Sequence, residues 1–118
     1  TIAGGLAVFK DVYFGGTTSS SSDKHLKRNI KQLPNILDKI KDINPIKYRN
    51  LNELDTKEYI GFIAQEFEEY FPELLSKKEE YYSLGYDRIT ALNFKCIKEL
   101  LDEINLLKLQ IKKLDYKI

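Results

Sequence analysis

Apolar and polar positions alternate most regularly in the last third of the 118-residue chain. Isoleucine and leucine recur there at spacings of three and four, the a and d positions of a heptad repeat, at Ile97, Leu100, Ile104, Leu107, Ile111, Leu114 and Ile118. So narrow a seam is typical of a helix that packs on a partner helix, since a helix on its own domain presents a wider apolar face. The pattern predicts a coiled-coil helix over 88–118, with Asp87 as its N-cap. The alternative is an amphipathic helix packed on its own domain.

The heptad positions also bear on the number of chains. Isoleucine at a with leucine at d favours a parallel dimer. Glu103 at g and Lys108 at the following e attract each other between parallel helices. Cys96 and Leu101 widen the apolar seam, which favours a third helix.

Between residues 33 and 87 the pattern predicts a small mixed domain of short helices and strands. A helix opens at Leu33-Pro34-Asn35, where proline suits the first turn, and ends at Asn44-Pro45. Its apolar stripe is Ile36, Leu37, Ile40 and Ile43. Strands are expected at 46–49, 59–64 and 81–84, the second apolar enough to be central, and a short helix at 65–71 with Phe67, Tyr70 and Phe71 inward. The fold class is therefore α+β.

The first residues differ in character from the rest. Glycines bracket a β-branched and aromatic run over 4–16, which is typical of strands but too short for a stable sheet. We therefore expect it to pair with preceding chain or with other subunits. Residues 17–22, Thr-Thr followed by four serines, read as a mobile linker. The predicted organisation is the end of a longer β-rich protein at 1–21 and a separate domain at 22–118.

The composition of the chain excludes several classes of partner and metal site. Nineteen basic and eighteen acidic residues give a net charge of +1, which provides no large field for nucleic acid or an anionic membrane. One cysteine and one histidine exclude a disulfide framework and a cysteine- or histidine-rich metal site. No apolar run approaches the roughly 20 residues that span a bilayer. We expect no metal, cofactor, membrane, nucleic-acid or small-molecule partner.

The residues after the linker carry the candidate chemistry. The stretch Ser22-Asp23-Lys24-His25-Leu26-Lys27-Arg28-Asn29-Ile30 resembles the SD-x-x-LK-x-NI signature of intramolecular chaperone auto-processing domains. These domains end phage tailspikes such as endosialidase and also occur in myelin regulatory factor. The GFIAQE run at 61–66, the FPEL run at 71–74, the segment 86–92 and the IKEL run at 97–100 resemble further motifs of that family in the same order.

The resemblance implies a self-cleaving serine endopeptidase that acts once, in cis. Ser22 is the implied nucleophile and Lys27 the implied general base, with the cut between Ser21 and Ser22. A serine hydroxyl needs a base, and a lysine amine is almost wholly protonated near neutral pH unless burial disfavours its charge. Folding around Lys27 would therefore supply the base. Asp23 is a candidate for orienting the loop and Gln65 for stabilising the oxyanion.

The family also implies a homotrimer. The expected function is an intramolecular chaperone that assembles a viral tailspike or fibre in the host cytoplasm and then cuts itself free. One alternative is a structural trimerisation module that stays attached, and another is the same domain in a membrane-released transcription factor. Taken singly, Ser22 reads as a linker serine and Lys27 as a surface lysine. His25 is expected to face solvent, and Gln65 suits a helix start as well as catalysis.

Overall fold

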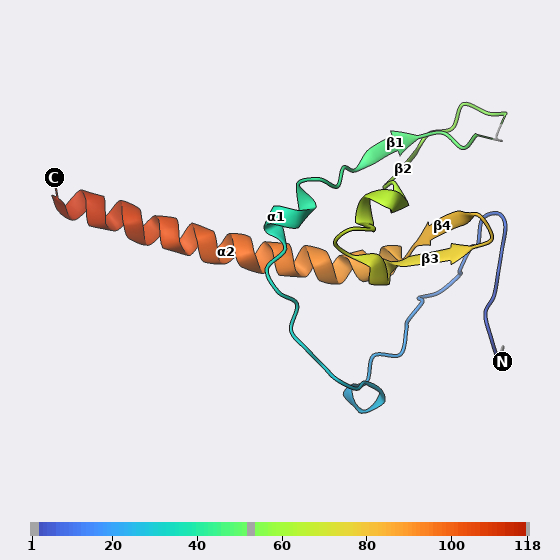
Figure 1. Cartoon of the computed structure of the whole chain (residues 1–118), viewed down its shortest axis with the longest axis horizontal. Helices are drawn as coiled ribbons and strands as arrows, with labels where there is room; N and C mark the ends of the chain where they lie inside the picture. Colours follow the sequence, from blue (N-terminus) through green and yellow to red (C-terminus); the bar gives the residue numbers. More distant parts are fainter. Residues whose placement is uncertain (1–2, 52–53, 118) are drawn as a thin grey trace. The chain divides into compact units, whose positions relative to one another are not determined.

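A computed structural model describes residues 3–51 and 54–117, with side chains described up to residue 115. It divides into two units, Thr1–Gln32 and Leu33–Ile118 (Figure 1). The first unit is extended chain with one 3-10 turn, η1 (Lys24–Leu26). The predicted strands over 4–16 are absent from it, and the apolar side chains of that stretch are exposed. A strand needs a hydrogen-bonded neighbour, and the single chain provides none there.

The second unit contains two antiparallel hairpins rather than one sheet. β1 (Ile46–Tyr48) pairs with β2 (Tyr59–Gly61), and β3 (Leu75–Lys78) pairs with β4 (Tyr81–Leu84). The prediction that 59–64 would form a central strand is wrong, because β2 has one neighbour and ends at Gly61. β4 has its predicted bounds. Its partner β3 was not predicted, since three of its four residues are polar.

Helical elements are shorter than predicted before the last one. The helix expected from Leu33 is reduced to α1 (Leu37–Ile40), and the one expected at 65–71 to the 3-10 turn η2 (Ala64–Phe67). A further 3-10 turn, η3 (Pro72–Leu74), begins at Pro72. The final helix α2 (Tyr86–Lys117) is long and continuous, as the heptad pattern predicted. It begins one residue before Asp87, which therefore lies in its first turn and not at its N-cap.

The core lies where η2, η3 and the first turns of α2 meet. Its most buried side chains are Ile36, Phe67, Phe71, Leu74, Ile89 and Leu92. The ring of Tyr86, at the start of α2, packs against Phe62, and its hydroxyl accepts the backbone N–H of Phe62 at 3.0 Å. A Cβ at Gly61 would lie 2.6 Å from that hydroxyl. A larger residue in place of this glycine would therefore displace the Tyr86 hydroxyl from its contact with Phe62.

One charged side chain is buried among the described residues, and it connects the last helix to the start of the unit. Glu99 of α2 is 8% exposed, and its Oε2 accepts the backbone N–H of Ile36 at 2.8 Å. Ile36 is the N-cap residue of α1, with φ of −130°. The bond satisfies a backbone donor at the start of α1 that has no acceptor within the helix.

Removing the Glu99 carboxylate should destabilise the second unit. Glu99→Ala leaves the Ile36 N–H buried without an acceptor, which costs about 1–3 kcal/mol. Glu99→Gln keeps an amide oxygen and should lose less. Urea denaturation at fixed protein concentration measures the difference. Asp102→Ala, at an exposed position of the same helix, is the control, and an equal loss in both alanine variants would contradict the role of the bond.

The heptad seam is not covered in the single chain. Its described members, Ile97 to Leu114, are between 46 and 63% exposed, and Ile118 lies outside the described residues. α2 continues well past the other elements of its unit (Figure 1). Among residues 3–51 and 54–117, no helix has the length and apolar character that crossing a membrane requires.

Candidate functional site

The residues of the SD-x-x-LK stretch form one tight turn within the first unit. Asp23, in extended conformation, is the N-cap of η1, and its carbonyl accepts the N–H of Leu26 at 3.0 Å. The N–H of Lys27 donates to the carbonyl of Lys24 at 3.1 Å, and the chain leaves the turn extended. This short 3-10 turn lies between Ser22 and Lys27 and reverses the chain. Ser22 therefore precedes the turn, and Lys27 follows it.

The turn brings the two predicted catalytic side chains into contact. Lys27 Nζ donates to Ser22 Oγ at 2.9 Å, within the range expected of a nucleophile and its base. An amine in this position that has lost its proton can accept the hydroxyl proton as the oxygen attacks. Both residues are exposed in the single chain. The burial of Lys27 that the base role was expected to need is therefore not supplied by this chain alone.

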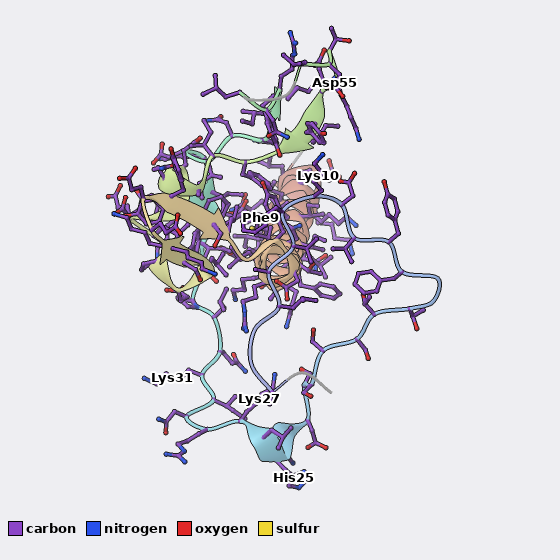
Figure 2. The ribbon with its side chains drawn as sticks, turned by 90° about the vertical axis from the view of Figure 1, so that its right-hand side faces the viewer. Phe9, Lys10, His25, Lys27, Lys31 and Asp55 are labelled. Atoms are coloured by element: carbon purple, nitrogen blue, oxygen red, sulfur yellow. The ribbon has the colours of Figure 1, made fainter. Side chains whose placement is uncertain are left out.

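Asp23 and His25 form a clasp across the turn. Asp23 Oδ1 accepts the backbone N–H of His25 at 2.8 Å and lies 2.8 Å from His25 Nδ1. The backbone hydrogen bond, followed by the one to the ring, holds the pKa of the Asp23 carboxyl below its ordinary value near 3.8. Figure 2 shows His25 at the outer tip of the turn, and its side chain is 85% exposed. His25 thus bonds to Asp23 and not to Ser22, and the clasp fixes the turn from outside.

The clasp should depend on pH. The pKa of Asp23 is lower in the folded turn than in an unfolded chain, so the clasp stabilises the turn at pH values above 3.8 and is lost as pH falls through the lowered pKa. Carboxyl-carbon NMR should place the Asp23 midpoint below 3.8. In His25→Ala the midpoint should return only part of the way, because the backbone donor remains. An unshifted midpoint in the parent chain would contradict the clasp.

The turn also contains a residue whose role the sequence did not reveal. Asn29 has φ of 54°, in the left-handed region. Asparagine adopts this conformation more readily than other side chains apart from glycine. The asparagine of the LK-x-NI pattern therefore redirects the chain just after Lys27. The signal was present in the motif, but a conformational role cannot be distinguished from a chemical one without the torsion angle.

The remaining candidates lie in the second unit. Gln65, proposed for the oxyanion, is an exposed residue of η2. Its neighbour Glu66 has a structural partner, because Glu66 Oε1 accepts the backbone N–H of Asn44 at 3.0 Å and its side-chain amide at 3.2 Å. In the described part of the chain no three histidine, cysteine, aspartate or glutamate side chains gather closely enough to hold a metal ion.

Comparison with known proteins bears on the same stretch. Residues 22–76 match the peptidase S74 family, described as the chaperone of endosialidase. The match begins at Ser22. The chain is also 36% identical over 104 residues to the long tail fiber protein Gp37 of Salmonella phage S16, an alignment that covers 80% of this chain and 14% of that protein. The chain thus spans about one seventh of the length of this relative. The segment that begins at Ser22 is thus similar to the endosialidase-chaperone family, peptidase S74, and to part of a phage long tail fiber protein.

Proposed function

We propose that this domain is the assembly chaperone of a phage-type fibre and that it frees itself by cutting the bond between Ser21 and Ser22. The observation that carries the proposal is the 2.9 Å contact between Lys27 Nζ and Ser22 Oγ, in the turn at which the family match begins. Residues 1–21 are then the end of the fibre, and their exposed apolar side chains would pair in the assembled fibre.

The reaction needs no cofactor. Ser22 Oγ attacks the carbonyl carbon of Ser21 as the hydroxyl proton passes to neutral Lys27 Nζ. The peptide C–N bond breaks as the proton is delivered to the departing α-amino group of Ser22, which leaves an ester between Ser21 and the Ser22 side chain. Water then hydrolyses the ester to the Ser21 carboxylate and restores the Ser22 hydroxyl. Lys27 acts as base and then as acid, so the dyad ends as it began.

Assembly is the step that makes Lys27 able to act as a base. A solvated lysine stays protonated near neutral pH, whereas an amine removed from water favours its neutral form. Lys27 is exposed in the single chain, and so is the apolar seam of α2. Association of three chains through the seam brings neighbouring units against each other and supplies the missing cover over Lys27. Cleavage then releases the chaperone domain only after the chains have assembled in register.

The proposal is tested by the mass of the purified wild-type chain. We expect two products, one ending at Ser21 and one beginning Ser-Asp-Lys-His at Ser22. N-terminal sequencing identifies the new end. A chain that assembles but stays intact would instead support an attached trimerisation module, for which the exposed seam alone suffices.

A further inference from the structure

An open apolar pocket lies beside the first turns of α2. It has a volume of about 480 Å³, and α2 contributes Ile89, Leu92, Asn93, Cys96 and Ile97 to its wall. Phe62, Phe67 and Phe71 contribute aromatic surface opposite. A cavity of about 150 Å³ with a comparable lining accepts benzene. This pocket is therefore large enough for the ring of a phenylalanine.

The pocket lies on the side of α2 that carries the g positions of the heptad. With Ile97 at a, residues Ile89 and Cys96 occupy g positions, which flank the seam. Asn93 and Ile97 are themselves d and a positions. The pocket is thus continuous with the face through which the helices are proposed to associate.

The seam changes character at the level of the pocket. The d and a positions before Ile97 are Asn93 and Thr90, both polar. Next to these polar positions, at the e position, lies Phe94, whose side chain is 67% exposed. An exposed phenylalanine therefore stands on the side of the helix opposite the pocket, where the regular apolar seam is interrupted.

Parallel packing in register brings these two sides together. In such a coiled coil a g residue faces the e residue five positions later on the neighbouring helix. The four successive pairs are Ile89 with Phe94, Cys96 with Leu101, Glu103 with Lys108, and Gln110 with Asp115: two apolar pairs, an attractive charge pair and a polar pair that can form a hydrogen bond. Every pair is complementary in this register.

We infer that the pocket is the docking site for Phe94 of a second copy of the chain. The inference rests on the association required by the proposed function, and it names the contact that sets the register. Each neighbour inserts its ring beside Ile89, and Leu101 packs on Cys96 one heptad later. The ion pair between Glu103 and Lys108 then favours the parallel orientation.

The chain contains no tryptophan, so Phe94→Trp is a clean probe. The experiment uses a Ser22→Ala background, which keeps the chain whole and separates this test from cleavage. On going from dilute to assembled protein, the emission of Phe94→Trp should shift to the blue and its quenching by acrylamide should fall several-fold. Leu109→Trp, at an f position that is 57% exposed, should show neither change.

A second arm reports the register even if tryptophan disturbs the pocket. Burial, and then the Glu99 charge, raise the pKa of the Cys96 thiol, so oxidation is catalysed by copper–phenanthroline at mildly alkaline pH. Leu101→Cys should form covalent multimers with native Cys96 on a non-reducing gel, whereas Leu109→Cys should not. Multimers that persist in Leu101→Cys with Cys96→Ser would mean e-to-e contact between antiparallel helices and would overturn the inference. So would assembled Phe94→Trp that stays open to acrylamide, or a chain that is monomeric throughout.

Discussion

Ser22→Ala should leave the bond between Ser21 and Ser22 intact, and Lys27→Ala should slow its cleavage by at least about a hundredfold, the lower range for loss of a general base. The first variant has no oxygen to attack the carbonyl, and the second has lost the amine that contacts Ser22 Oγ. Lys27→Arg is the sharper variant, because a guanidinium can still donate to Ser22 Oγ but does not lose its proton near neutral pH. It should also remain uncut. Intact-mass spectrometry over time measures all three.

Two neighbours serve as matched controls for the dyad. Ser20→Ala changes a serine of the same linker, and Lys24→Ala removes an exposed lysine of the same turn. Both variants should cut like the parent chain. Cleavage that persists in Ser22→Ala, or a main product that begins at another residue, would contradict the assignment of nucleophile and cut.

Aspartate at both Ile104 and Leu107 should abolish association and cleavage together. These residues are adjacent a and d positions, and unpaired charges in a packed seam are destabilising by several kcal/mol. Each 1.4 kcal/mol is about tenfold in an association constant. The variant should therefore be monomeric at concentrations where the parent associates, and it should stay uncut with Ser22 and Lys27 unchanged. Sedimentation and intact mass on the same samples test both effects.

The same helix provides the control for this variant. Leu106 and Leu109 lie at c and f positions, away from the seam, and are as exposed as the seam residues. Leu106→Asp with Leu109→Asp adds the same charge and removes two leucines. It should still assemble and cut. A loss of assembly equal to that of the seam variant would mean that overall charge, and not the seam, decides association.

The parts of the fold that could be predicted were those with a strong local pattern. The heptad predicted the continuous helix α2, and β-branched and aromatic runs located β1, β2 and β4. Of the three aromatic residues expected to face inward at 65–71, Phe67 and Phe71 are buried and Tyr70 is half-buried. The small mixed fold with a long last helix is confirmed. The trimer remains a prediction.

What could not be predicted depends on partners distant in sequence. Glu99, 63 residues away, accepts the N–H of Ile36, a contact that no local pattern indicates. β3 is too polar to be identified without β4 beside it. The run at 4–16 has strand composition, yet it forms no strand without a neighbour to pair with.

For the candidate site, sequence and structure contributed different things. The motif register singled out Ser22 and Lys27 from the surrounding serines and lysines, and the structure places their side chains in contact. The bond between His25 and Asp23, and the left-handed Asn29, depend on backbone torsions that spacing does not encode. Lys27 is exposed in the single chain, and its burial by a neighbouring subunit remains a prediction.

The most direct test of this account follows cleavage of the wild-type chain after refolding at a series of concentrations. Samples are withdrawn over time, and the cleaved fraction is compared with the assembled fraction in each. If assembly supplies the cover that neutralises Lys27, the rate of cutting rises with concentration in step with the assembled fraction, and the dilute monomer stays whole. A monomer that cuts at the same rate at every dilution would contradict the account, because cleavage would then belong to the single chain.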